Sequence, residues 1–160
     1  MINAVIIGFS HMHVNEVALY ISENPDFELV GAADVNAGEE KIPELRYTAG
    51  WNLENVRKNY CANIYEDYKK MLDELKPDFV AVCTPNMHHK EWTIKALEAG
   101  AHVACEKPMA ISLSDAEEMW KTAKRCKKHL FPCQCMRWRN YMQQSKELVD
   151  NGELGDVYFS

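Results

Sequence analysis

The chain has 160 residues, of which 26% are charged and 47% hydrophobic, and its formal net charge is −6. The length suits about one domain, and the composition is that of a globular protein, which excludes the disordered and fibrous classes. The lysines are scattered except at residues 121–128, where the end of a predicted helix explains them, so no basic face indicates a nucleic-acid partner.

Five short apolar runs predict the strands of the core. They are residues 3–9, 27–35, 78–85, 101–108 and 130–136. Because the runs are continuous and lack polar alternation, they suit parallel strands that are covered on both faces.

Four segments with helical periodicity alternate with these strands, at residues 13–24, 65–76, 86–100 and 114–126. We expect Asn86 to cap the third helix and Gly100 to end it. The fourth helix has Ser114 and Glu117 at capping-box spacing, and its apolar face includes Trp120. The alternation predicts an α/β fold, a doubly wound parallel sheet of the Rossmann type with right-handed crossovers.

The cysteines and the apolar runs indicate the cellular compartment of the protein. No apolar run approaches the ~18 residues of a membrane span, and no basic segment precedes the first run as in a signal peptide. Cys83, Cys105, Cys133 and Cys135 lie in apolar runs, the last two at alternating positions that share one face of a strand. We interpret them as reduced, buried thiols and expect a cytoplasmic protein with no membrane contact.

The candidate ligand site lies in the loops that follow the strands, because open α/β sheets bind ligands at the carboxyl ends of their strands. Gly8 allows a tight turn after the first strand, and the next helix offers its first N–H groups to a phosphate. Asp34 closes the second strand 26 residues after Gly8, where a carboxylate can bind a ribose 2′-hydroxyl and so favours NAD over NADP. By themselves, one glycine and one aspartate fit a connecting turn and a surface acid equally well.

Two further loops carry more specific motifs. Residues 84–86 read Thr-Pro-Asn and are followed by His89, residues 96–103 read ALEAGAHV, and residues 106–108 read Glu-Lys-Pro and are followed by Ala110. In this order and spacing the chain resembles the Gfo/Idh/MocA family, the oxidoreductases that include glucose–fructose oxidoreductase and myo-inositol dehydrogenase. The resemblance covers the chain except for residues 37–60, which we interpret as a surface excursion.

The resemblance implies hydride transfer between the nicotinamide of NAD (NADP possible) and a hydroxyl-bearing carbon of a sugar or cyclitol. It gives Lys107 the catalytic role, because a lysine beside the reacting carbon can hydrogen-bond the alcohol oxygen, and burial would lower its pKa. Glu106 would hold the motif, and Pro108 would fix the loop. The predicted cofactor contacts are Gly8, Phe9, Ser10, His11, Met12, Asp34, Thr84, Pro85, Asn86, His89, Glu106 and Lys107.

Two departures from the family stand out. The family loop has the pattern GxGxxG, whereas here Ser10 and His13 occupy the second and third glycine positions. The loop keeps its length, so we expect the turn to form, and the affinity for NAD is the property that these substitutions would affect. The alternative function that they leave open is a non-catalytic Rossmann-type module for ligand sensing or subunit pairing.

The second departure concerns the end of the chain. We predict that residues 1–136 form the dinucleotide-binding domain, and that residues 137–160 form a linker helix, to about Asp150, and a first strand from Asp156. In the family a C-terminal α+β domain follows, which supplies substrate contacts and further catalytic groups. We therefore expect the chain to be a fragment that is inactive by itself, and the full-length form to be a homo-oligomer.

Four histidines raise the question of a metal ion. His11, His13, His88 and His89 fall near one predicted edge of the sheet, and imidazoles are good ligands for zinc and nickel. No carboxylate or thiolate joins them at ligand spacing in the sequence, and the family needs no metal. The sequence therefore predicts no metal site.

Overall fold

The computed structural model describes residues 1–35, 43–61 and 63–158. Its centre is a parallel sheet of six strands in the order β3-β2-β1-β4-β5-β6. The strands are β1 (Ile2–Ile7), β2 (Phe27–Ala33), β3 (Ile64–Tyr65), β4 (Phe79–Val82), β5 (His102–Cys105) and β6 (Leu130–Pro132). This order is that of a Rossmann fold and confirms the predicted fold class. The five predicted strands are present, and the two-residue strand β3 was missed.

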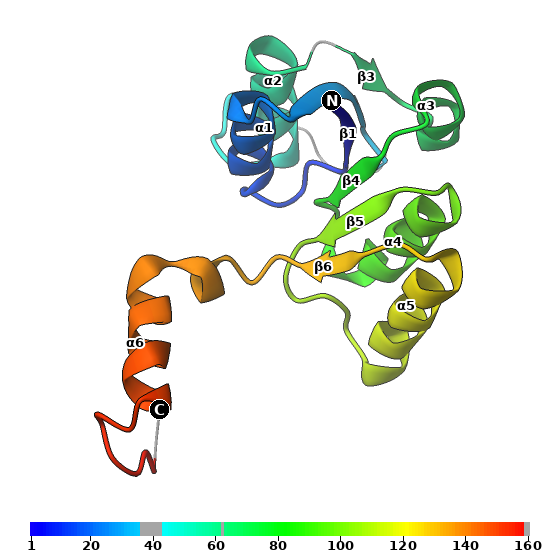
Figure 1. The fold of residues 1–160 in the computed structure, drawn as a ribbon. Helices are drawn as coiled ribbons and strands as arrows, with labels where there is room; N and C mark the ends of the chain where they lie inside the picture. Colours follow the sequence, from blue (N-terminus) through cyan, green and yellow to red (C-terminus); the bar gives the residue numbers. More distant parts are fainter. Residues whose placement is uncertain (36–42, 62, 159–160) are drawn as a thin grey trace.

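Helices cover both faces of the sheet (Figure 1). They are α1 (Val14–Glu23), α2 (Ala49–Asn59), α3 (Tyr68–Leu75), α4 (His89–Glu98), α5 (Leu113–Cys126) and α6 (Asn140–Asp150), with 3₁₀ turns η1 (Asn86–His88) and η2 (Cys135–Trp138). Helices α1 and α2 pack on one face, and α3, α4 and α5 pack on the other. In β1, Ile6 faces the α1 and α2 layer, whereas Val5 and Ile7 face the opposite layer. The central strand β1 is thus buried on both sides, as its unbroken apolar run predicted, whereas Phe131 in the edge strand β6 is exposed.

Three local predictions about helices were wrong. Helix α5 begins at Ser112, whose hydroxyl accepts the N–H of Asp115, so the cap lies two residues before Ser114. Trp120 is 49% exposed and is not part of the core. Asn86 makes no side-chain cap bond and opens the 3₁₀ turn η1 instead of α4.

The segment predicted as a surface excursion contains a core helix in its second half. Residues 36–42 lie outside the described part of the chain. Helix α2, however, begins after Thr48, whose hydroxyl accepts the N–H of Trp51, and it buries Leu53 and Val56 in the layer next to β1. The prediction is therefore wrong for residues 49–59.

The chain leaves the sheet after β6. Strand β6 ends at Pro132, so Cys133 and Cys135 are not on one strand face, and Cys135 is exposed. Helix α6 has no buried residue and stands away from the sheet in Figure 1. Its predicted end at Asp150 is confirmed. Residues 156–158 are not a strand, and the last two residues lie outside the described part.

Neither α6 nor any other helix in the described residues combines the length and the apolar character that crossing a bilayer requires.

Candidate functional site

The candidate site lies where the strand order reverses. Strand β1 has β2 on one side and β4 on the other, so the loops after β1 and β4 meet at the carboxyl edge of the sheet. Gly8 makes this meeting possible. Its φ is +87°, and a Cβ atom there would lie 2.5 Å from Cγ2 of Thr84 and 2.9 Å from the Thr84 backbone. A side chain at residue 8 is therefore excluded by both conformation and space.

The loop after Gly8 is held by weak backbone bonds. The N–H groups of Ser10 and His11 both donate to the carbonyl oxygen of Cys83, at 3.2 and 3.3 Å. The N–H of His13 donates to Nδ1 of His11 at 3.3 Å. These distances are longer than the usual ~2.9–3.0 Å of an N–H···O bond. Helix α1, which follows, has no side-chain cap, so a phosphate could take over these donors at little cost.

A pocket of about 520 Å³ opens beside this loop. Its size lies in the range of small-ligand and cofactor sites, about 300–1,000 Å³. Five of the predicted cofactor contacts line it together with three residues around the start of α2. The lining residues are Ser10, His11, Thr84, Pro85 and Asn86, with Tyr47, Thr48 and Ala49.

The other predicted contacts of the first two loops lie outside this pocket. Phe9 is 1% exposed and belongs to the core between β1 and α2. Met12 is exposed and lines a neighbouring depression with Arg46 and Tyr47. Asp34 follows β2 at the same edge of the sheet, where its N–H donates to the Tyr65 carbonyl oxygen at 2.9 Å. Its position fits the predicted role at a ribose.

His89 lies beneath the pocket. It is 0% exposed, and its two ring nitrogens face two backbone carbonyl oxygens, Nδ1 that of Pro108 at 2.8 Å and Nε2 that of Thr84 at 3.0 Å. The side chain therefore joins the loop after β4 to the loop after β5. This geometry indicates a positioning residue, and the predicted cofactor contact of His89 stays a prediction.

The loop after β5 separates its two charged residues. Glu106 is 2% exposed and accepts the N–H of Lys107 at 3.1 Å, whereas Lys107 is exposed and precedes a cis peptide bond to Pro108. The burial expected for Lys107 is thus absent in the described chain. Lys107 is close enough to His11 for its charge to lower the pKa of that imidazole, which brings the predicted catalytic residue near the pocket wall.

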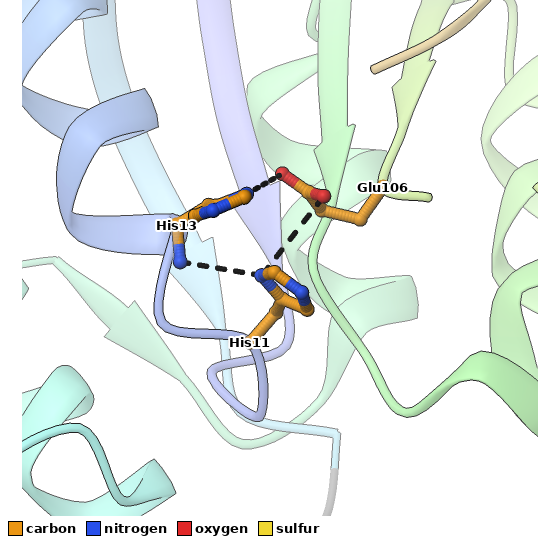
Figure 2. Close-up of side chains that lie close together, drawn as sticks. All are labelled: His11, His13 and Glu106. Atoms are coloured by element: carbon orange, nitrogen blue, oxygen red, sulfur yellow. Dashed lines mark hydrogen bonds and ion pairs between the residues drawn. The ribbon is translucent and has the colours of Figure 1, made fainter. Parts of the chain in front are cut away.

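Glu106 also meets two histidines of the first loop (Figure 2). Nδ1 of His13 lies 3.3 Å from Oε1 of Glu106, and Nδ1 of His11 lies 3.9 Å from Oε2. Burial lowers the pKa of His11, while the Glu106 carboxylate opposes this shift. The expectation that no carboxylate joins these histidines is therefore wrong, although His88 and His89 do not belong to the cluster.

Sequence reasoning missed the contribution of α2. Asn52 is 0% exposed, donates to the Phe9 carbonyl oxygen at 2.8 Å and accepts from Nδ2 of Asn15 at 2.7 Å. Just before α2, the Arg46 guanidinium lies 4.7 Å from the ring centre of Tyr47. No motif marks these residues; the available signal was the Thr48 cap followed by a weak apolar period.

The residues present fit a dinucleotide. The pocket lies beside an uncapped helix N-terminus, the one residue that must lack a Cβ atom does lack it, and a carboxylate follows β2. Ser10 stands at a glycine position of the family pattern, and its side chain lines the pocket together with that of His11.

Comparison with known sequences supports the same assignment. The chain matches the family described as "Oxidoreductase family, NAD-binding Rossmann fold" over residues 2–133. It is 35% identical over 157 residues to D-glucoside 3-dehydrogenase of Escherichia coli, covering 98% of this chain and 41% of the relative. It is 32% identical over 140 residues to glucose-6-phosphate 3-dehydrogenase of Bacillus subtilis, covering 88% and 36%. The chain thus spans about two fifths of the length of these relatives.

Solved structures agree with this result. The WlbA dehydrogenase of Bordetella pertussis, determined in complex with NADH and UDP-GlcNAcA, superposes with a TM-score of 0.80 at 25% identity, covering 98% of this chain and 44% of that one. The strand order, the Gly8 turn and the Thr-Pro-Asn and Glu-Lys-Pro loops are the features that the sequence resemblance rested on. The chain belongs to the Gfo/Idh/MocA family of oxidoreductases and carries its NAD-binding Rossmann fold.

Proposed function

We propose that this chain is the cofactor-binding part of an NAD-dependent dehydrogenase that acts on a hydroxyl-bearing carbon of a sugar or cyclitol. The observation that carries the proposal is the pocket between Ser10 and Asn86, formed where the strand order reverses. The pyrophosphate would lie on the loop after β1, and Asp34 would bind the adenosine ribose. Bound NAD would supply the hydride acceptor.

Lys107 is the residue that we assign to the reacting oxygen. It follows β5 at the carboxyl edge of the sheet, its side chain is exposed, and its N–H donates to the Glu106 carboxylate in a loop that His89 contacts. In its neutral form, an amine in this position can accept the alcohol proton as the carbinol becomes a carbonyl, and the ammonium that results can donate the proton back in the reverse direction. Glu106 and His89 act through the backbone as positioning residues.

The rest of the proposal concerns the larger protein. Residues 1–136 are proposed as the dinucleotide-binding domain, and residues 137–160 as the connection to a second, α+β domain that completes the substrate site. The exposed α6 helix, which carries Tyr141 and Leu148 on its surface, supports this division. We further propose that the full-length protein is a cytoplasmic homo-oligomer, which the reduced cysteines suit.

The cofactor proposal is tested by titrating NADH and NADPH into the protein and following tryptophan fluorescence. We expect saturable binding with NADH preferred. Asp34→Ala should weaken NADH binding about 10- to 100-fold, because a hydrogen bond to a charged group contributes about 1.5–3 kcal/mol, and should reduce the preference over NADPH. Asp73→Ala, which removes an exposed carboxylate of α3, is the matched control.

Absence of saturation at millimolar NADH, with the fold intact by circular dichroism, would contradict the cofactor proposal and favour the non-catalytic module.

The role of Lys107 is tested in the full-length protein with an alkyl glucoside, glucose 6-phosphate and myo-inositol as substrates. Lys107→Met should lower kcat about 10²- to 10⁴-fold, the usual contribution of general acid–base groups, with little change in the Kd of NADH. Equal turnover by this variant would exclude the role.

A further inference from the structure

Three side chains from distant parts of the sequence point their ligand atoms at one another (Figure 2). His11 and His13 come from the loop after β1, and Glu106 follows β5, two strands away in the sheet. One ring nitrogen of each histidine and one carboxylate oxygen of Glu106 lie within 4.8 Å of one another. His11 and Glu106 are also among the predicted cofactor contacts, whereas the phosphate-binding role of the loop depends on its backbone N–H groups.

The carboxylate is the unusual member of the cluster. Glu106 is 2% exposed, and in the described residues no lysine or arginine forms an ion pair with it. A buried carboxylate is costly unless charges or donors surround it. Among the described residues its partners are the Lys107 N–H at 3.1 Å and the two imidazoles, so the histidines carry most of the compensation.

The two histidines cannot both compensate Glu106 as donors in this arrangement. Nδ1 of His11 accepts the N–H of His13, so it carries a lone pair and faces Oε2 of Glu106 at 3.9 Å. The lone pair of this nitrogen thus faces the buried carboxylate oxygen. A cation between them would turn this repulsion into attraction, because imidazole lone pairs and carboxylate oxygens are the atoms that bind metals.

The distances suit a first-row transition metal. Two ligands of a tetrahedral ion at about 2.0–2.1 Å lie about 3.4 Å apart. The His13–Glu106 separation is 3.3 Å, and the His11–Glu106 separation of 3.9 Å closes with a small rotation of a half-exposed side chain. We propose that His11, His13 and Glu106 bind one divalent ion of the zinc type. Two imidazoles and one carboxylate suit Zn²⁺, Co²⁺ or Fe²⁺ and do not suit Ca²⁺ or Mg²⁺, which prefer oxygen ligands.

Three protein ligands leave a coordination position open, as in catalytic and not in structural zinc sites. Here the open position faces the pocket, because His11 is both a ligand and part of the pocket wall. An ion there presents positive charge to an anionic oxygen, such as that of a phosphate. The metal site would thus add a cation to a loop in which Ser10 and His13 replace glycines. The proposal goes beyond NAD binding and stands on these three side chains alone.

The test is a titration of chelator-treated, reduced protein with Zn²⁺ in the absence of any dinucleotide. We expect one equivalent to bind. Co²⁺ in its place should give visible d–d bands of a four- or five-coordinate site without a thiolate charge-transfer band. Glu106→Gln and His13→Ala should each weaken Zn²⁺ binding about 10²-fold or more, since even the partners that only orient metal ligands contribute 10- to 100-fold.

Two controls separate this site from other groups that bind metals. His102→Ala removes one ring of the stacked His102–His129 pair, which lies at the amino ends of β5 and β6, away from the candidate site. Cys135→Ser removes an exposed thiol. Both variants should bind Zn²⁺ like the unaltered protein. If Glu106→Gln fails to fold by circular dichroism, His11→Ala, which changes a half-exposed loop residue, gives the same test.

Absence of a saturable equivalent of Zn²⁺ would overturn the proposal. So would binding that persists in His11→Ala and His13→Ala but is lost in His102→Ala or Cys135→Ser. Because no cofactor is present, these outcomes are independent of the NADH titration, and either proposal can fail while the other stands.

Discussion

Two buried polar side chains hold the loops of the site from opposite faces of the sheet. His89, in α4, bonds the carbonyl oxygens of Thr84 and Pro108 and so fixes the loops after β4 and β5 to each other. Asn52, in α2, bonds one carbonyl oxygen of the loop after β1, that of Phe9. The N–H groups of Ser10 and His11 donate to Cys83 at 3.2–3.3 Å, and the Met12 carbonyl oxygen accepts from Nδ2 of Asn15 at 2.9 Å. We call the loops after β4 and β5 the fastened side, because one buried side chain joins them, and the loop after β1 the loosely held side, because its N–H bonds to the loop after β4 are long.

This difference assigns different tasks to the two sides. The fastened side carries Lys107, which we propose to act on the reacting oxygen, and a residue in that role must be positioned closely because small displacements cost rate. The loosely held side carries Ser10 and His13, the substitutions that separate this chain from the family pattern. Adjustment to a ligand is therefore expected in the loop after β1, and the following predictions test this division.

The largest effect is expected where the two sides touch. Gly8→Ala would place a Cβ atom 2.5 Å from the Thr84 side chain and 2.9 Å from its backbone, at a φ of +87°. We expect a loss of about 2–5 kcal/mol in the free energy of unfolding from strain and overpacking together, measured by urea denaturation. NADH binding should be lost with it.

Gly100→Ala is the matched control for this change. Gly100 has a φ of +94°, but a Cβ atom there would have no neighbour within 4 Å. It should therefore cost only the conformational part, about 1–2 kcal/mol. Equal losses in the two variants would show that the contact with Thr84 does not limit the loop.

The next largest effect is expected on the fastened side. His89→Leu removes the imidazole that joins the carbonyl oxygens of Thr84 and Pro108, and at least one of them loses its donor. We expect a loss of about 2–4 kcal/mol in the free energy of unfolding, because an unsatisfied buried polar group costs about 1–3 kcal/mol. His88→Leu, at the neighbouring exposed histidine, should change it by less than about 0.5 kcal/mol. A loss below 1 kcal/mol for His89→Leu would mean that the two loops hold each other without it.

A smaller effect is expected on the loosely held side. Asn52→Ala removes the bond to Phe9 and the partner of Asn15, and we expect a loss of about 1–3 kcal/mol. The control is Asn59→Ala, which removes an exposed side-chain hydrogen bond to Asn55 in the same helix. If the loop adapts as proposed, Asn52→Ala should weaken NADH binding while Lys107 chemistry in the full-length protein keeps its kcat. A fall in kcat equal to that of His89→Leu would contradict the division.

The sequence predicted the frame of this molecule because the frame rests on local patterns. Unbroken apolar runs gave five of the six strands, and the two residues of β3 are too few to form such a run. The start of α5 was misplaced because Ser112 and Asp115 have the same spacing as Ser114 and Glu117. Local spacing fits either serine as the cap, so it does not distinguish Ser112 from Ser114.

The parts of the site that were missed depend on distant contacts. His13 and Glu106 are 93 residues apart, and they meet because a long side chain reaches across β4. Asn52 lies in a segment without family motifs, and its role appears only when α2 is placed against the loop after β1. Motifs located the pocket lining, whereas the anchors beneath it required the tertiary structure.

The smallest predicted effect concerns pH and the fastened side. Cys105 ends β5 directly before Glu106, and burial raises the pKa of its thiol from 9.0 to about 12, with the Glu106 charge adding to the shift. Below pH 9 the thiol is protonated in both the folded and the unfolded chain, so its contribution to stability is complete. Above pH 9 the unfolded chain releases this proton and the folded chain keeps it, so the free energy of unfolding falls as the pH rises toward 12.

The fall due to Cys105 is at most about 1.4 kcal/mol per pH unit. In Cys105→Ala it should disappear, so the stability of the variant should decline less steeply than that of the unaltered protein between pH 9 and pH 11. Urea denaturation at several pH values measures both slopes, and the groups that titrate in both proteins cancel in the difference. Between pH 6 and pH 8 the two slopes should coincide, which is the internal control. Parallel curves above pH 9 would mean that water reaches the end of β5, and the side of the site that His89 fastens would then be less closed than its hydrogen bonds indicate.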